Sequence, residues 1–408
     1  MMNFYLQLVF VSLVLFSQHV LAEPTSLESA TVKPLGFNIP FASDALSDNV
    51  SVDIYLPASY YKSTKSYPVI YLFDSEYLFD YTVANMKARW QRELAPESII
   101  VGVNTTSFST RINFAMPIKR PNGSIFAGHA KPEKMAQFLS KELSLYVEKH
   151  YRTAPYRIGI GLSPTATNII YDFIAKKPFF NAHIAIASDL HFTALDDTPL
   201  HQLISDKIAK RPSSFFYHSK AMSDFNQDDS GKALYLSLHQ KSNGNQGRFI
   251  TDVPENTEHY AVAITSINRA FMHLFPTHVW LPDYAEFRRS LKPAQTLADF
   301  YATRNNQVGY PTYPLVESYW SINNVKALTE HLIRQKQLRE ARELLAWATA
   351  LLPSNAQLHL MMSNVLMQLD EKDLAAQHGN VAMTLALQQG AETAHFSLTL
   401  PAINRYVK

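Results

Sequence analysis

Short apolar runs alternate with helix-like segments through the first two thirds of the chain. Residues 68–73, 98–103 and 157–162 are apolar on both faces, as the central strands of a parallel sheet are. The other predicted elements are strands over 50–57, 183–187, 214–218 and 247–250 and helices over 86–94, 133–150, 165–177 and 264–275. Strands separated by helices indicate a doubly wound, mostly parallel sheet. The predicted fold class is therefore α/β.

Ser163 lies where one of these runs meets a helix. The residues Gly161-Leu162-Ser163-Pro164-Thr165 join the strand over 157–162 to the helix that follows. A serine on such a sharp strand-to-helix turn is how an α/β-hydrolase exposes its nucleophile, usually within the pattern G-x-S-x-G, and here Thr165 replaces the second glycine. We predict that Ser163 is a nucleophile. The competing interpretation is a helix start, with Ser163 as the N-cap and Pro164 as the first helical residue.

Candidate partners for this serine follow later strands. A serine nucleophile needs a histidine base and an acid that orients it, in the chain order serine, acid, histidine. His259 lies in a polar loop after residues 247–250, at the carboxyl end of a strand, where open α/β sheets place their active sites. The loop after strand 214–218 carries three acids, Asp224, Asp228 and Asp229. We favour Asp224 because it lies nearest the strand, and the spacing leaves the other two open.

The composition excludes several kinds of protein. The 408 residues include 37 Lys and Arg against 35 Asp and Glu, a net charge of +2, and contain no basic run. This balance argues against a nucleic-acid or anionic-membrane partner and favours small molecules or proteins. The chain has no cysteine, which excludes disulfides, thiolate metal sites and cysteine catalysis. We predict no metal and no cofactor, because neither an H-E-x-x-H motif nor a phosphate-binding glycine loop occurs.

The first 22 residues resemble an export signal. Residues 8–16 form an apolar core, and Val20-Leu21-Ala22 before Glu23 is a small-residue cleavage site, although no Lys or Arg precedes the core. An uncleaved anchor is the alternative, but a membrane span needs about 20 apolar residues. We therefore predict a signal peptide over 1–22, export to the periplasm or secretion, and no membrane span in the mature chain.

From about residue 320 the periodicity is helical throughout. Three residue pairs match at an offset of 34: Ala341 with Ala375, Ala348 with Ala382, and Leu351 with Leu385. This is the tetratricopeptide period, in which small residues let paired helices pack closely, and an ordinary helical bundle is the alternative. Two units rarely bury their own faces, so we expect this tail to pack on the first domain or on a protein partner. The predicted domains are an α/β domain over 23–305 and a tetratricopeptide-like domain over 306–408, with a connector within 293–321.

Several motifs in a fixed order together resemble a known family. They are residues 52–57, 67–74, 99–103, 110–111, 117, 138–139, 142–143, 151–153, 161–163, 180–186 and 258–260, within a span of roughly 45–280. In these residues the chain resembles the putative-esterase family of α/β-hydrolases, which includes esterase D-type enzymes, siderophore esterases and some carbohydrate esterases. The resemblance implies an α/β-hydrolase fold and hydrolysis of a small-molecule ester through Ser163 and His259.

Three residues depart from the pattern of that family. Leu162 stands where a histidine is usual, Asn113 stands where an aspartate is common, and Pro164 follows the nucleophile. In α/β-hydrolases the N–H after the nucleophile supplies half of the oxyanion hole, and proline has no N–H. Losing one such donor costs about 100- to 1000-fold in rate. Proline also restricts the residue before it to extended conformations, which would oppose a strained turn at Ser163.

The other half of the oxyanion hole is expected in the loop after strand 68–73. The N–H of Ser75 or Glu76 would supply this second donor, and the Thr165 hydroxyl is a further candidate. Two functions follow. The first is an exported serine esterase that acts through an acyl-enzyme and is weakened by Pro164. The second is a catalytically impaired hydrolase fold that serves as a binding or scaffold module through its helical tail.

Overall fold

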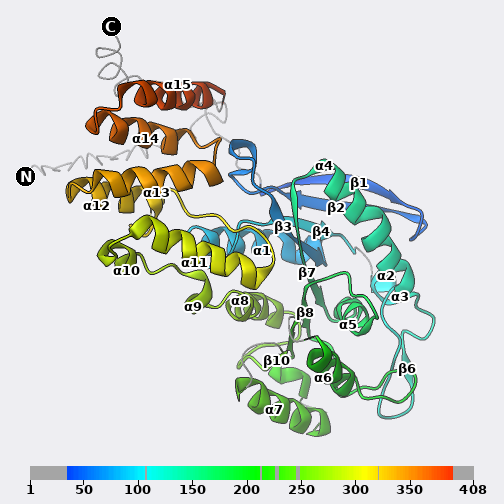
Figure 1. Cartoon of the computed structure of the whole chain (residues 1–408). Coiled ribbons are helices and arrows are strands. Elements are labelled where there is room, and N and C mark those ends of the chain that lie inside the picture. The colour runs from blue at the N-terminus through cyan, green and yellow to red at the C-terminus, as the bar shows by residue number, and fades with distance from the viewer. Residues whose placement is uncertain are drawn as a thin grey trace, which may run out of the picture. The chain divides into compact units, whose positions relative to one another are not determined.

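A computed structural model of the chain describes residues 35–105, 108–211, 214–225, 229–244, 249–319 and 321–388 (Figure 1). The predicted signal peptide lies outside these residues, so it stays a prediction. The main sheet has eight strands in the order β1-β2-β4-β3-β7-β8-β9-β10. Their bounds are β1 Phe37–Ser43, β2 Asp48–Tyr55, β3 Tyr67–Phe73, β4 Ile99–Val103, β7 Thr153–Leu162, β8 Ala182–Ile186, β9 Phe215–Ser219 and β10 Phe249–Asp252.

Six neighbouring strands of this sheet are parallel, from β4 to β10, while β1 and β2 are antiparallel to their neighbours. The parallel strands β3, β4, β8 and β9 are buried along their whole length, as their continuous apolar sequence predicts. A two-stranded hairpin, β5 Ile118–Lys119 with β6 Ile125–Phe126, lies outside this sheet. The predicted doubly wound, mostly parallel sheet is therefore confirmed.

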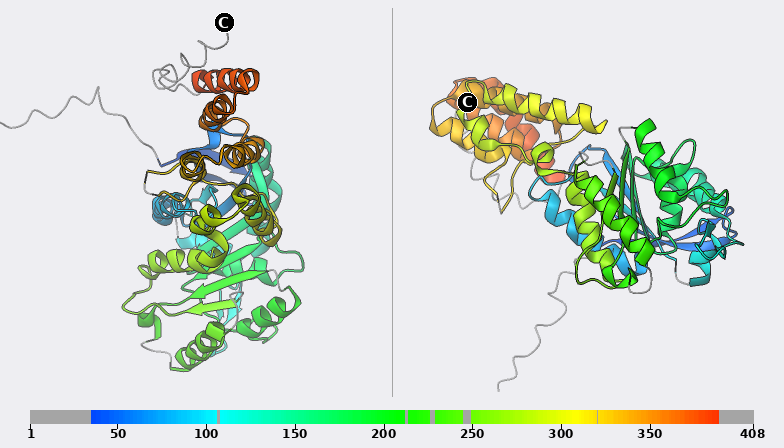
Figure 2. Two further views of the ribbon diagram at one scale, coloured as in Figure 1. Left: turned by 60° about the vertical axis from the view of Figure 1, so that its left-hand side comes forward. Right: turned by 90° about the horizontal axis from the view of Figure 1, so that it is seen from below.

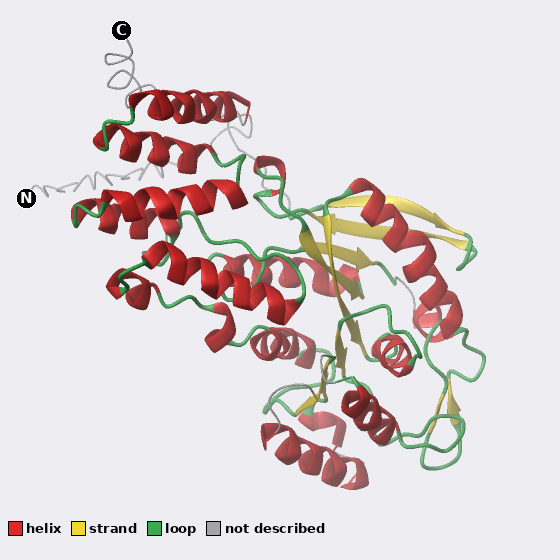
Figure 3. Cartoon of the chain, viewed as in Figure 1, coloured by secondary structure: helices red, strands yellow, loops and turns green. Residues whose placement is uncertain are grey.

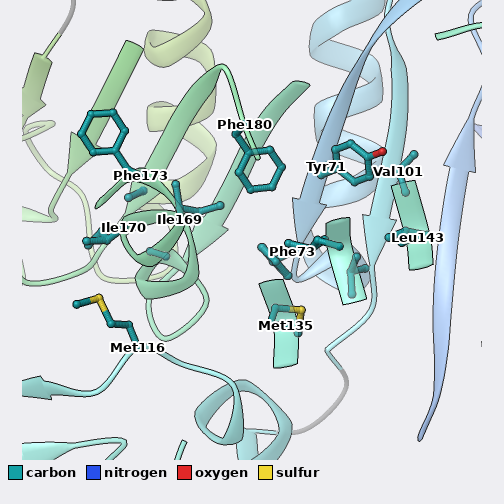
Figure 4. Packing of buried hydrophobic residues seen from close by; sticks show 14 of the residues in the cluster. Tyr71, Phe73, Val101, Met116, Met135, Leu143, Ile169, Ile170, Phe173 and Phe180 are labelled. Carbon is teal, nitrogen blue, oxygen red and sulfur yellow. The ribbon is translucent and has the colours of Figure 1, made fainter. Parts of the chain in front are cut away.

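Helices cover both faces of the sheet (Figures 2 and 3). Side chains alternate along β3, so that Tyr71 and Phe73 face one layer while Ile70 and Leu72 face the other. Figure 4 shows the first layer, in which the strands pack on residues such as Met135 and Phe173. The helices of that layer are α3 Pro132–Gln137, the π-helical η3 Phe138–Leu143, α4 Ser144–His150, α5 Ala166–Ile174 and α6 Leu200–Lys210. The opposite face is covered by α1 Ser75–Trp90 and α8 Val262–Leu274.

The remaining elements before residue 275 are short segments and one longer helix. They are η2 Tyr60–Lys62, α2 Phe108–Asn113, η4 Met222–Phe225 and α7 Asp229–Gly244. The loop that holds η4 leaves the carboxyl end of β9 and lies at the edge of the sheet where the parallel strands end.

The C-terminal part is helical, as predicted, and has its own buried cluster. Its helices are α9 Thr277–Trp280, α10 Tyr284–Arg289, α11 Pro293–Val308, α12 Val325–Arg334, α13 Leu338–Leu351, α14 Ala356–Gln368 and α15 Lys372–Gln388. The prediction of a connector over 293–321 is wrong for its first half, which forms α11, and the boundary predicted at residue 305 falls inside that helix. Ala341, Ala348, Ala375 and Ala382 are fully buried between helices. A true tetratricopeptide repeat stays a prediction.

Within the part of the chain that the structure describes, no helix is both long enough and apolar enough to cross a bilayer.

Candidate active site

Ser163 follows β7 in a left-handed backbone conformation. Its φ is +57°, and its N–H donates to the carbonyl of Ile186 at the end of β8, at 2.8 Å. The N–H of Thr165 donates to the carbonyl of Leu162 at 3.2 Å and closes a four-residue turn. In this turn φ is positive at the second residue, Ser163, and the third residue is Pro164, whose ring fixes a negative φ, the φ pattern of a type II′ turn. Pro164 therefore fits the third position, while Ser163 does not take the extended conformation that proline favours in the residue before it.

The interpretation of Ser163 as a helix N-cap is wrong. Helix α5 begins at Ala166 and its N-cap is Thr165. The hydroxyl of Ser163 makes no capping bond and lies 2.9 Å from Nε2 of His259. Ser163 thus occupies the kind of strained strand-to-helix turn that exposes a nucleophile.

Position 161 favours glycine because the backbone of Thr165 and Ala166 passes close to its Cα. A Cβ at Gly161 would lie 2.6 Å from the carbonyl oxygen of Thr165 and 2.8 Å from the nitrogen of Ala166. Real Cβ atoms are not found so close to other heavy atoms, and the atoms met here are backbone, which would have to shift to admit a side chain. The first glycine of the pattern therefore lets helix α5 start directly above the strand.

His259 and Asp224 complete a line of hydrogen bonds from Ser163. His259 lies between β10 and α8, and Asp224 lies in η4 after β9. The two carboxylate oxygens of Asp224 each lie 3.1 Å from Nδ1 of His259. An acceptor at Nδ1 places the proton there and leaves Nε2 to accept the proton of Ser163. The structure thus brings the three predicted residues together in the chain order serine, acid, histidine.

Two alternatives for the acid cannot be compared with Asp224. Asp228 and the side chain of Asp229 lie outside what the structure describes.

The carboxylate of Asp224 is 15% exposed and the ring of His259 is 35% exposed. The imidazole is therefore open to a substrate, while the acid behind it is largely shielded from water.

Ser75 and Glu76 begin helix α1 at the same edge of the sheet. Leu72 of β3 pairs with Ile160 of β7, so β3 and β7 end side by side. The N–H groups in the first turn of a helix have no acceptor within the helix. The side chains point to other partners: Ser75 Oγ donates to Asp53 at 2.6 Å, and the Glu76 carboxylate accepts from Arg111 at 2.8 Å. The backbone N–H groups are thus the donors that this turn presents.

The suggestion that the Thr165 hydroxyl is a further oxyanion donor is wrong. This hydroxyl lies 2.5 Å from Oδ2 of Asp74 and accepts the N–H of Leu162 at 2.8 Å. Thr165 is 1% exposed, so its side chain is committed inside the protein. Asp74 had no predicted role, although its position directly after a buried strand and one residue before the predicted donors could have indicated one.

The other two departures from the family pattern have different surroundings. Leu162 is buried and packs in the apolar layer of α1 and α8, so an apolar side chain suits this position. Asn113 ends α2 and is exposed. Among the described residues, no group of three or more His, Asp or Glu side chains is arranged to hold a metal ion.

Comparison with solved structures identifies the class of fold. An IroE-like serine hydrolase from Shewanella oneidensis has a TM-score of 0.61 and 20% identity, over 78% of this chain and 99% of that one. An uncharacterised protein from Capnocytophaga ochracea has a TM-score of 0.55 and 19% identity, over 85% of this chain and 93% of that one. A siderophore hydrolase from Aspergillus nidulans is more remote, with a TM-score of 0.47 and 14% identity over 60% of this chain and 97% of that one. The chain has the fold of an α/β-hydrolase.

A family model matches part of the sequence. Residues 43–168 match the family model described as "Putative esterase", a segment that includes β2, β3, β4 and the turn at Ser163. A comparison with curated proteins finds no significant match. The resemblance to the esterase family is confirmed over this segment.

Proposed function

We propose that the protein is a serine esterase that hydrolyses a small-molecule ester through an acyl-enzyme. The observation that carries the proposal is the line from Ser163 Oγ to His259 Nε2, at 2.9 Å, and from His259 Nδ1 to Asp224, at 3.1 Å. A serine hydroxyl is a weak nucleophile unless an adjacent base takes its proton, and this base is held in the required tautomer by the acid.

The chemistry follows from these positions in two balanced steps. In the first, Ser163 Oγ bonds to the ester carbonyl carbon while its proton passes to His259 Nε2, and the alcohol leaves with that proton. In the second, water adds to the acyl carbon, its proton passes to His259, and Ser163 leaves and recovers a proton. The oxyanion of each tetrahedral intermediate is stabilised by the N–H groups of Ser75 and Glu76.

Pro164 weakens this chemistry in the proposal because the turn has no N–H after Ser163. The scaffold hypothesis requires no strained serine and no oriented imidazole, so the geometry at Ser163 supports the esterase. Export to the periplasm or outside the cell is part of the proposal and is supported by the sequence of residues 1–22. N-terminal sequencing of the mature protein is expected to begin at Glu23.

Ser163→Ala tests the function directly. We expect the purified parent to hydrolyse a short-chain aryl ester and to react with a fluorophosphonate probe, and the variant to do neither. Ser205→Ala is a matched control, since the Ser205 hydroxyl returns to the carbonyl of His201 on α6 at 2.8 Å, away from the sheet edge. Equal rates in parent and Ser163→Ala, or no labelling of a folded parent, would favour the scaffold.

A further inference from the structure

Two helix N-termini at the candidate site are joined through their N-cap side chains. Asp74 is the N-cap of α1, which carries the proposed oxyanion donors, and Thr165 is the N-cap of α5, which follows the nucleophile. Thr165 Oγ1 lies 2.5 Å from Oδ2 of Asp74. Neither side chain makes a capping bond to its own helix.

The missing cap on α1 is unusual for an aspartate. An N-cap aspartate ordinarily accepts an N–H from the second or third residue of its helix. Asp74 instead has φ +57° and ψ +42°, and the N–H of Tyr77 donates to the main-chain carbonyl of Asp74 at 3.0 Å. The carboxylate is turned away from the first turn, so it does not occupy the N–H of Glu76, the second residue of the helix.

Three donors hold the Asp74 carboxylate in this turned-away position. Besides Thr165, the hydroxyl of Thr105 donates to Oδ1 at 2.9 Å, and Nε of Arg111 lies 2.9 Å from the same oxygen. Asp74 is 1% exposed, and burial raises the pKa of its carboxyl, which the bonds from Thr165 and Thr105 and the charge of Arg111 oppose. A buried carboxylate that lost these partners would require other donors, and the N–H of Glu76 in the first turn of α1 has no acceptor within the helix.

We propose that Asp74 is a positioning residue for the oxyanion site, anchored by Thr165. The anchored carboxylate leaves the N–H of Glu76 uncapped and fixes the turn that bears Ser75 and Glu76 against the turn that bears Ser163. This inference rests on the proposed esterase function. Pro164 makes the positioning by Asp74 more important. Because the residue after Ser163 has no N–H, the donors of α1 have to stabilise the oxyanion without that usual second donor.

Thr165→Val tests the anchor, since it removes the hydroxyl and keeps the shape. We expect kcat to fall about 100-fold, as misplacement by about 1 Å does, with KM little changed. Thr165→Ser is expected to restore most of kcat. Thr82→Val is the matched control, a buried threonine on α1 whose hydroxyl returns to the carbonyl of Leu78 at 2.8 Å. Loss of kcat in Thr165→Val without rescue by Thr165→Ser, or no loss in a folded Thr165→Val, would overturn the inference.

A double-mutant cycle shows whether Thr165 acts through Asp74. If it does, Thr165→Val should add little to the loss of kcat in Asp74→Asn, whereas independent effects would multiply and contradict the inference. Amide hydrogen exchange provides a readout that does not need turnover. The N–H of Glu76 should exchange rapidly in the parent and slowly in Thr165→Val, where the freed carboxylate caps it. Protection of this amide in the parent would refute the positioning role, while an inactive parent with rapid exchange would refute only the esterase function.

Discussion

Restoring the missing N–H is the perturbation that most directly measures what Pro164 does. Pro164→Ala adds a backbone N–H after the nucleophile and keeps a Cβ. The turn does not depend on the proline ring: the carbonyl of Pro164 accepts the N–H of Thr167 at 3.1 Å and its hydroxyl at 2.6 Å, and the N–H of Thr165 closes the turn onto Leu162 at 3.2 Å. We therefore expect Ala at position 164 to keep the same conformation.

The size of the gain follows from the value of one donor. A single oxyanion donor contributes about 3 kcal/mol, so kcat should rise about 100-fold or more. Replacing proline loosens the unfolded chain and should lower the free energy of unfolding by about 0.4–1 kcal/mol. The two effects have opposite signs, so a faster and slightly less stable enzyme is the specific expectation.

The assay compares kcat, KM and thermal unfolding for the parent, Pro164→Ala and Pro57→Ala. Pro57 is a matched control, because it is buried and follows β2, which ends at the opposite edge of the sheet from Ser163. A folded Pro164→Ala whose kcat is no higher than that of the parent would refute the reasoning, because it would show that no oxyanion donor is missing at this position.

Three further variants test the site and its support. Gly161→Ala should lower both the melting temperature and the activity, since its Cβ would meet the Thr165 carbonyl at 2.6 Å; a fully stable, active variant would contradict the close packing. Asp224→Asn should lower kcat by about 10⁴ with the fold intact, because the His259 tautomer is lost, and a loss below tenfold would point to another acid. Burial lowers the pKa of His218 to about 3 from 6.5. As the pH falls from 6.5 toward 3, the unfolded chain therefore binds a proton at His218 that the folded protein does not bind. The free energy of unfolding is unaffected by this group above pH 6.5 and falls below it, by about 2 kcal/mol at pH 5. Denaturant unfolding at pH 7.5 and 5 should show this loss in the parent and not in His218→Gln.

The sheet could be predicted from the sequence because its strands are buried on both faces. Each predicted strand overlaps an observed one with bounds that differ by at most four residues, and the run over 98–103 corresponds to β4, Ile99–Val103, whereas the exposed strand β1 was not predicted. Helix α11 was missed although Pro293 begins it and Gly309, with φ +79°, ends it. These are ordinary helix boundary residues. The prolines and tyrosines that follow α11 are typical of a connector, and the prediction extended this interpretation to the whole stretch over 293–321.

The start of α1 was missed for a different physical reason. The prediction placed a helix only near 86–94, whereas α1 runs from Ser75 to Trp90. Its first two turns contain Tyr77, Phe79 and Tyr81, residue types that favour strands in isolation, and become helical because Leu78 and Phe79 pack onto the sheet. Tertiary packing of this kind has no local signature in the sequence.

At the site, chain order identified the types of residue but not their contacts. The order serine, acid, histidine led to Ser163 and His259, whereas the choice of Asp224 over Asp228 and Asp229 depends on the path of a loop. The partners of Thr165 could not be predicted either, because its bond to Asp74 joins residues 91 positions apart. Hydrogen bonds between separate loops are fixed by the sheet register, which single-sequence patterns do not give.

Three of the ten described non-glycine residues with positive φ lie at strand ends where the chemistry is proposed. Asp74, Ser163 and Ala187 directly follow the adjacent strands β3, β7 and β8, and their φ angles are +57°, +57° and +55°. Non-glycine residues in this region cost of order 1–3 kcal/mol each and persist only where their surroundings hold them. The sheet does so at two of them: the N–H of Ser163 bonds to Ile186 at 2.8 Å and that of Ala187 to Ser219 at 2.7 Å.

The same support explains how the turn tolerates a threonine in place of the second glycine of the nucleophile pattern. A polar side chain buried above the strand would ordinarily be costly. Here the Thr165 hydroxyl accepts the N–H of Leu162 and is bonded to Asp74, so both of its hydrogen-bonding roles are satisfied. The residue that breaks the pattern thus ties the strained turn at Ser163 to the strained turn at Asp74, and each turn helps to hold the other in place.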